Sequence, residues 1–341
     1  MSNAQPALTF EEMRALVRNL PGPDLDSGTA ALQRQSQLTK PPGSLGRLED
    51  LAQWLATWQG RHPAELRRPR VAVFAANHGV VAQGVSPYPA AVTAQMVANF
   101  ARGGAAVNRL CEVADAELRV YELDLDNPTR DFTESPAMDE EECCRAMAYG
   151  MMAAEMGVQL LGLGEMGIGN TTAAAALCCA LFGGDARGWV GRGTGVDDAG
   201  FERKVAAVEA GLAANPQARD DPFEALRRLG GFEFAAIAGA VLAARMARMP
   251  VVLDGYACTA AAAVLFKADR RALDHCVVAH RSVEPGHSRL LEAIGKDPIL
   301  DLGMRLGEGS GAALAIPILK AAAECHAGMA TFAEAGVSDR A

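Results

Sequence analysis

The segment from Val158 to Thr172 constrains the fold more than any other part of the chain. An apolar run at 158–163 leads into Gly164-Glu-Met-Gly-Ile-Gly-Asn-Thr-Thr172 and then into an alanine-rich stretch, an order that predicts a strand, a glycine-rich turn and a helix. Glycine allows the backbone to approach an anion closely, and the free N–H groups at the start of a helix favour negative charge. The segment therefore predicts a phosphate-binding turn. The alternative is that its glycines only allow close packing of helix against strand.

Two more glycine-rich turns follow, Gly191-Arg-Gly-Thr-Gly-Val-Asp-Asp198 and Arg305-Leu-Gly-Glu-Gly-Ser-Gly311, and together they predict a phosphorylated substrate. The first turn also fits the dinucleotide fingerprint as Gly162-x-Gly-x-x-Gly167, but the acidic residue that should end the next strand is missing. The turn also resembles the phosphate-binding loop of nucleoside triphosphatases, but Asn170 stands where that loop has the lysine that contacts the terminal phosphates. An ATPase is therefore disfavoured, and an NAD(P)-dependent oxidoreductase is a weaker alternative.

Short apolar runs alternate with helical stretches from residue 71 onward. The runs lie at 71–76, 118–123, 158–163, 189–190, 251–253 and 276–279. This alternation predicts an α/β fold with a Rossmann-like parallel sheet of about six strands and helices on both faces. Ligands of such sheets bind beyond the carboxyl ends of the strands, where the polar residues after these runs fall.

Helical patterns without strands fill residues 9–60, and a long alanine-rich helix is expected at 311–326. We expect a small helical domain formed by residues 1–65 and completed by about 320–341. Residues 66–319 would form the α/β domain.

Composition limits the classes of function. Half of the 341 residues are hydrophobic, which suits a large core, and the net charge of −9 argues against a nucleic-acid or anionic membrane surface. No apolar run approaches the roughly 20 residues of a membrane span, and residues 1–6 lack the pattern of a signal peptide. The eight cysteines show no CxxC spacing and indicate a reducing cytoplasm. The spacing of His275, His280 and His287 matches no standard ligand pattern, so no metal is predicted.

Glu308 is the sharpest candidate for catalysis. It stands between two glycines at the expected start of a helix, where a ligand can approach closely. Burial would raise its pKa toward the working pH of a general base, whereas the helix N-terminus would lower it. Arg305 would contact a phosphate. The alternative is that Glu308 caps the helix and that Arg305 is its solvated neighbour.

An ordered set of motifs resembles the family of nicotinate-nucleotide–dimethylbenzimidazole phosphoribosyltransferases, from about residue 9 to the final Ala330-Thr-Phe-Ala-Glu-Ala-Gly-Val337. The set comprises Lys40-Pro-Pro-Gly-Ser-Leu-Gly-Arg-Leu-Glu49, Gly84-Val-Ser-Pro, Val92-Thr-Ala-Gln-Met-Val97, Gly103-Gly-Ala-Ala-Val-Asn108, the three glycine-rich turns and His280-Arg-Ser-Val-Glu-Pro-Gly-His287. The chain departs from the family at Asn77, where Asp is more common, so a charged role there is doubtful. His78 is interpreted as structural.

The resemblance implies transfer of the 5-phosphoribosyl group of nicotinate mononucleotide to 5,6-dimethylbenzimidazole, with inversion at the anomeric carbon. The products would be nicotinate and α-ribazole 5′-phosphate, the lower-ligand nucleotide of cobalamin. Direct attack needs no cofactor and no covalent intermediate. The resemblance also implies a homodimer in which the helical domain of one subunit closes the other's site.

By the same resemblance, each site residue takes a role. The catalytic residues would be Glu308, as general base, and Glu165; the phosphate and ribose would be bound by Gly167, Gly193, Thr194, Lys204, Ser282 and Arg305; the base would be bound by Tyr88, Gln95, Met166 and Leu306. Without the motifs, Met166 and Leu306 would be ordinary core residues and Lys204 part of a solvated helix face. Two alternatives remain beside the oxidoreductase: a family member that uses another base, and a nucleotide-binding protein without catalysis.

Overall fold

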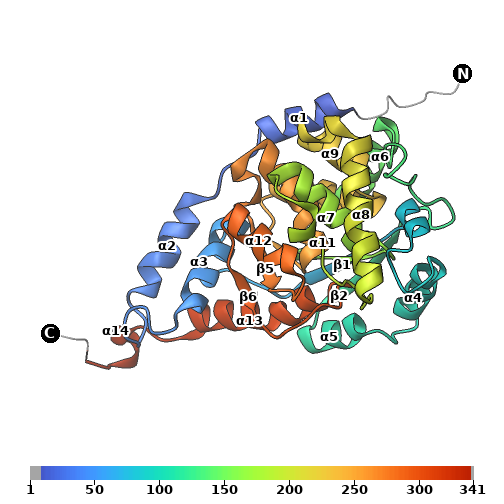
Figure 1. The fold of residues 1–341 in the computed structure, drawn as a ribbon. Helices are drawn as coiled ribbons and strands as arrows, with labels where there is room; N and C mark the ends of the chain where they lie inside the picture. Colours follow the sequence, from blue (N-terminus) through green and yellow to red (C-terminus); the bar gives the residue numbers. More distant parts are fainter. Residues whose placement is uncertain (1–8, 339–341) are drawn as a thin grey trace, which may run out of the picture.

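A six-stranded parallel sheet, with strand order β2-β1-β3-β4-β5-β6, forms the centre of the computed structural model, which describes residues 9–338 (Figure 1). The strands are β1 (Pro69–Ala75), β2 (Glu117–Glu122), β3 (Leu160–Met166), β4 (Val251–Leu253), β5 (Cys276–His280) and β6 (Pro298–Leu300). The predicted fold class is confirmed. Residues 1–8 and 339–341 lie outside the described residues. They include residues 1–6, where no signal peptide is predicted, and both ends of the predicted helical domain.

Helices cover both faces of the sheet, as predicted. Those on one face are α2 (Leu25–Gln35), α3 (Arg47–Gln59), α4 (Ala91–Ala101), α5 (Ala106–Ala114) and α13 (Ser310–Gly328). Those on the other are α1 (Phe10–Arg18), α6 (Glu140–Met151), α7 (Asn170–Phe182), α8 (Asp198–Ala214), α9 (Pro222–Leu229), α10 (Phe232–Met246), α11 (Tyr256–Ala268) and α12 (Pro285–Ile294). Along β1, Val71 and Val73 join the first core and Ala72 and Phe74 the second, because successive side chains of a strand point to opposite faces.

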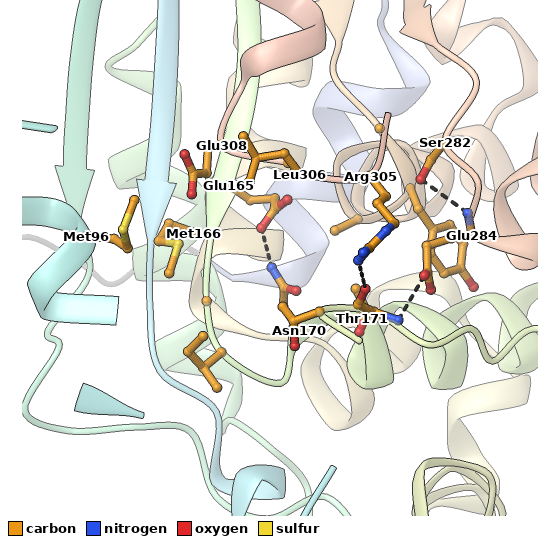
Figure 2. Close-up of a pocket in the computed structure, with 18 of the residues that line it drawn as sticks. Met96, Glu165, Met166, Asn170, Thr171, Ser282, Glu284, Arg305, Leu306 and Glu308 are labelled. Atoms are coloured by element: carbon orange, nitrogen blue, oxygen red, sulfur yellow. Dashed lines mark hydrogen bonds between the residues drawn. The ribbon is translucent and has the colours of Figure 1, made fainter. Parts of the chain in front are cut away.

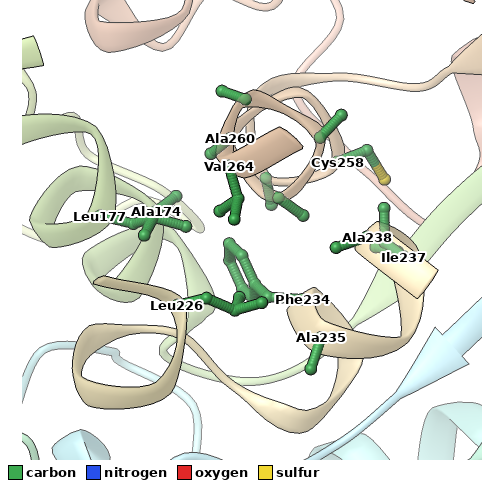
Figure 3. Packing of buried hydrophobic residues seen from close by; sticks show 14 of the residues in the cluster. Ala174, Leu177, Leu226, Phe234, Ala235, Ile237, Ala238, Cys258, Ala260 and Val264 are labelled. Carbon is green, nitrogen blue, oxygen red and sulfur yellow. The ribbon is translucent and has the colours of Figure 1, made fainter. Parts of the chain in front are cut away.

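The core on the second face is built mainly from small side chains. Figure 3 shows Phe234 of α10 among Leu226 of α9, Val264 of α11 and Ala174 of α7. The many alanines let these helices approach one another closely, which explains why the sequence there is alanine-rich rather than amphipathic.

One predicted strand is wrong and one was missed. The run at 189–190 follows a single helical turn, η2 (Ala186–Gly188), and the N–H groups of Trp189 and Val190 both donate to the carbonyl of Ala186, at 3.0 and 3.1 Å. The indole Nε1 of Trp189 donates to Gly183, so this run is apolar because it is buried in a turn. Strand β6 lies at the edge of the sheet and is only partly buried, so it carries no long apolar run.

Helix α2 and the residues that follow it lie beside the C-terminal segment, whereas α1 lies at the opposite end of the molecule (Figure 1). Leu38 pairs with Thr331, just before α14 (Phe332–Ala335), and the Arg34 guanidinium donates to the carbonyls of His326, Ala327 and Met329 at 2.9 Å each. Helix α1, however, packs in the other core, with the ring of Phe10 at 5.6 Å from that of Phe223. The division into two domains stays a prediction. Within residues 9–338, no helix is long and apolar enough to cross a membrane.

Candidate active site

A cavity of about 600 Å³ opens beyond the carboxyl ends of β3, β4 and β5. The chain runs from β1 to β2 on one side and then places β3 on the other side of β1, and such a switch in strand order leaves a crevice at the carboxyl ends. All the predicted site residues line this cavity except Gln95 and Lys204. The glycine-rich turns, far apart in sequence, therefore meet at one place.

Two carboxylates occupy the middle of the cavity. Figure 2 shows them with sulfur-bearing side chains on one side and polar side chains on the other: Met96 and Met166, then Glu165 and Glu308, then Arg305, Thr171, Ser282 and Glu284. Val92, Leu306 and Tyr88 add to the apolar lining. The cavity thus offers an apolar slot suited to a flat ring and a polar end suited to an anion.

Gln95 does not line the cavity. It is exposed on α4, which presents Val92 and Met96 to the cavity instead. These two residues are four apart, the spacing that places side chains on one face of a helix, and this signal could have identified Met96. The predicted contact of Gln95 with the base has no support in the cavity lining and stays a prediction.

Lys204 is buried on α8, directly behind the cavity wall. Its Nζ donates to Thr171 Oγ1 at 2.8 Å and lies 2.9 Å from the position that a Cβ on Gly193 would take. Burial lowers the pKa of the ammonium group to about 8, and the negative charge of Glu284 opposes this shift. A solvated helix face is therefore excluded for Lys204. Its ammonium group lies beside Thr171 of the first turn, which carries Asn170 where a nucleoside triphosphate loop has lysine.

The second glycine-rich turn is tied to its neighbours at the polar end. The Gly193 N–H donates to Glu284 Oε1 at 2.8 Å, and the Gly193 carbonyl accepts from Arg305 Nη1 at 3.0 Å. Ser282 Oγ accepts from the Glu284 N–H at 3.3 Å. The backbone at Gly193 has φ +53°, a conformation that glycine adopts without strain. A guanidinium and a buried ammonium therefore lie beside this turn, and a phosphate bound here would compete with the Glu284 carboxylate for the Gly193 N–H.

Glu308 is held in an unusual backbone conformation. Its φ is +62°, and Gly307 and Gly309 on either side also have positive φ. Such a conformation costs a non-glycine residue on the order of 1–3 kcal/mol and persists where the surroundings impose it. The Glu308 N–H donates to the Glu165 carbonyl at 3.1 Å. The third glycine-rich turn is thus fixed against the end of β3.

Asp254, which sequence reasoning did not select, anchors this turn from the end of β4. Its carboxylate accepts from the N–H groups of Gly309, at 3.2 Å, and Ala312, at 2.8 Å, and so caps α13. The Glu308 carboxylate makes no hydrogen bond to any residue within 9–338, so the helix-capping interpretation of Glu308 is wrong. It is free to meet a ligand.

Burial decides the protonation of both glutamates. It raises the pKa of Glu308 to about 7, and the neighbouring charge of Asp254 adds to the rise. Burial likewise raises the pKa of Glu165 to about 8, with Asp254 adding and the hydrogen bond from Asn170 opposing. The lowering of the Glu308 pKa expected from the helix N-terminus is therefore outweighed by burial. A carboxylate with a pKa near 7 has the proton affinity that a general base needs at neutral pH.

The dinucleotide fingerprint fails on geometry. Gly162 and Gly164 lie inside β3, paired with Val71 and Val73 of β1, so they do not form the turn that would hold a pyrophosphate. Gly164 is needed for close packing, because a Cβ there would collide with the backbone of Gly309. The packing interpretation therefore holds for Gly164, and the turn that faces the cavity starts at Gly167.

We expect Gly164→Ala to lower the free energy of unfolding by about 3 kcal/mol, since the added methyl must push the 307–309 turn away. Turnover should fall with it, because Glu308 moves. The matched control is Gly162→Ala on the same face of β3, whose Cβ would lie 3.3 Å from side-chain atoms of Ala312 and Val71 and 3.5 Å from the Arg70 carbonyl oxygen, with no contact below 3.0 Å. Chemical denaturation of both variants checks the difference. Equal stability would remove the close contact as the reason for Gly164.

Neighbouring polar residues have structural partners. His78 Nε2 pairs with Glu233 Oε1 at 2.5 Å, both fully buried, which agrees with a structural role, and the Asn77 amide donates to the Leu125 carbonyl. His275 contacts the Val241 carbonyl, and His287 Nδ1 accepts from the Ser282 N–H. Among the residues that the structure describes, no group of three or more His, Cys, Asp or Glu side chains is arranged to hold a metal ion.

A family model described as a phosphoribosyltransferase matches residues 20–337. The chain belongs to this phosphoribosyltransferase family. Relatives named nicotinate-nucleotide–dimethylbenzimidazole phosphoribosyltransferase in Sinorhizobium medicae (strain WSM419) and Rhizobium etli (strain CIAT 652) are 59% and 60% identical over 333 residues, covering 98% of both chains in each case. The crystal structure of CobT from Thermus thermophilus matches with a TM-score of 0.87 and 46% identity, over 92% of this chain and 100% of that one.

Proposed function

We propose that this phosphoribosyltransferase transfers the phosphoribosyl group of nicotinate mononucleotide to 5,6-dimethylbenzimidazole, giving α-ribazole 5′-phosphate and nicotinate. One observation carries the proposal: Glu308, with a pKa of about 7, lies between an apolar slot and an anion-binding turn. The full-length likeness to relatives named for this activity supports the same choice of substrates.

The two ends of the cavity would bind the two substrates. The phosphate would be bound by the Gly193 turn, Arg305 and Lys204, where two cationic side chains lie close to one turn. The benzimidazole would lie among Met96, Met166 and neighbouring apolar groups, whose soft surfaces suit a ring with two methyl groups. The anomeric carbon of the ribose then falls between these ends, beside the two glutamates.

The chemistry follows from that alignment. One ring nitrogen of the benzimidazole attacks the anomeric carbon as the bond to the pyridine nitrogen breaks, and that electron pair leaves with nicotinate. The other ring nitrogen loses its proton to Glu308, which acts as general base. Glu165, once ionised, would stabilise the positive charge that develops on the ribose. Attack and departure on opposite faces invert the anomeric centre, and alignment of the two rings supplies much of the acceleration.

The direct test is to incubate the purified protein with nicotinate mononucleotide and dimethylbenzimidazole and to measure both products by chromatography. Nicotinate and α-ribazole 5′-phosphate should appear in equal amounts. Nicotinate alone would mean hydrolysis or a different acceptor base, which competition with adenine or a phenol would then identify. If neither product forms while the nucleotide binds, the protein is a nucleotide-binding protein without this activity.

We also propose a homodimer and a cytoplasmic location. Tyr88 and Leu306 line the cavity yet are 50% and 54% exposed, so its mouth lacks a cover that a second copy would supply. All eight cysteines are free, as expected for a reducing compartment. Sedimentation analysis tests the dimer, since a monomer at micromolar concentration would contradict it. Cell fractionation tests the location, since recovery outside the cytoplasmic fraction would contradict it.

A further inference from the structure

His280 is a buried imidazole at the wall of the cavity for which the reaction above has no use. It ends β5, is 1% exposed and lines the cavity. Neither of its ring nitrogens has a hydrogen-bond partner among the described residues. A buried polar group left in this way costs about 1–3 kcal/mol, so its partner is expected to be a molecule that enters the cavity.

Two glycines next to the His280 ring leave room for it. A Cβ at Gly311 would collide with His280, and one at Gly255 would come within 3.0 Å of Nε2. Asp254 Oδ1 lies 3.9 Å from Nε2, and His287 is the neighbouring ring at 6.5 Å between centroids. Nε2 is therefore the ring nitrogen beside Asp254 and beside Gly255, a residue that lines the cavity. An N–H on Nε2 is then the donor of His280 that a ligand beside Gly255 would meet.

Charge decides which ligand group fits. Among the described residues that line the cavity, the basic side chains are Arg305 and His280. Arg305 donates to the Gly193 carbonyl at the proposed phosphate end, whereas His280 adjoins Asp254 and Gly255 at the end of β4. Nicotinate mononucleotide has two anionic groups, the phosphate and the carboxylate on the pyridine ring. With the phosphate bound at Gly193, the ring carboxylate is the remaining anion.

We propose that His280, which lies beside Asp254, donates an N–H to the carboxylate of the pyridine ring and so selects nicotinate over nicotinamide nucleotides. This inference rests on the proposed function, since it concerns the leaving group of that reaction. Nicotinamide mononucleotide has a neutral amide at the same position and so offers His280 no anionic oxygen as acceptor. His280 is thus a specificity-determining residue.

The test compares nicotinate and nicotinamide mononucleotides in the wild-type protein and in His280→Gln, at saturating dimethylbenzimidazole. The wild type should prefer the acid. In His280→Gln, kcat/KM for the acid should fall roughly 10- to 100-fold, the value of a charge-assisted hydrogen bond, while kcat/KM for the amide stays within about twofold. His275→Gln is the matched control, because His275 is an equally buried imidazole that contacts Val241 and does not line the cavity. Its ratio of acid to amide should equal that of the wild type.

An equal fall with both nucleotides, or no preference in the wild type, would overturn the proposal. A second variant, His280→Asn, and the melting temperatures of both variants separate a loss of folding from a loss of selectivity. A misfolded variant loses activity with both nucleotides. If the wild type transfers no phosphoribosyl group at all, the proposed function fails. Calorimetric binding of the two nucleotides then still decides on His280, since the variant should lose the tighter binding of the acid.

Discussion

Replacing Glu308 by glutamine is expected to lower kcat by about 10²- to 10⁴-fold, the usual contribution of a general base. Glutamine keeps the size of the side chain but cannot accept the proton of the attacking benzimidazole. Because the proposed phosphate contacts lie at the other end of the cavity, the affinity for nicotinate mononucleotide should change by no more than about twofold. Single-turnover kinetics together with calorimetric binding separates the two effects.

The pH dependence gives a second measurement of the same role. Burial raises the pKa of Glu308 to about 7, so the carboxylate is protonated and inactive as a base when the pH falls below that value. The wild-type kcat/KM should therefore fall as the pH drops through about 7, and Glu308→Gln should lose this limb. The charge of Asp254 shifts the pH at which Glu308 titrates, and the charge of Glu308 in turn shifts that of Glu165.

Glu324→Gln is the matched control for the loss of a glutamate. Glu324 is exposed on the same helix, α13, and away from the cavity. This variant should match the wild type in rate and pH profile. Unchanged turnover in Glu308→Gln would remove Glu308 as the base and would leave Glu165 as the carboxylate next to be tested.

Long, regular sequence patterns predicted most of the fold. The strand, glycine-rich turn and helix from Val158 to Thr172 were predictable because an apolar run, a cluster of glycines and an alanine-rich stretch follow one another without a competing signal. The edge strand β6 was not, since three partly buried residues have no pattern that distinguishes them from a loop. Trp189 shows the converse error, because a buried turn is as apolar as a strand.

Part of the candidate site could likewise be predicted from the sequence, and part could not. Glu308 and Arg305 could be selected from the third glycine-rich turn itself, and the resemblance supplied a role for Lys204. Asp254 and His280 could not be assigned, because the sheet brings the ends of β4 and β5 together and no spacing in the sequence records that. The raised pKa of Glu308 was equally out of reach. It depends on how completely the 307–309 turn is buried against β3.

Lys204→Met should lower kcat/KM for nicotinate mononucleotide by roughly 10- to 100-fold, mainly through KM, because the buried ammonium would no longer attract the phosphate. Methionine fills similar space without charge. Burial lowers the pKa of Lys204 to about 8, so the wild-type protein should lose affinity as the pH rises above that value and the cation is lost. The variant should show weak affinity throughout and no such limb.

Stability distinguishes this role from a structural one. The lowered pKa of Lys204 means that the fold disfavours the buried charge, so Lys204→Met should unfold at pH 7 at a temperature no lower than the wild type. Lys320→Met, on α13 beside Asp115, is the control and should leave KM unchanged. A variant at Lys204 that melts early and loses kcat and KM together would indicate that the lysine supports the Thr171 turn rather than the phosphate. Nucleotide titrations across pH 6 to 10 therefore decide whether the ammonium group acts on the ligand or on the fold.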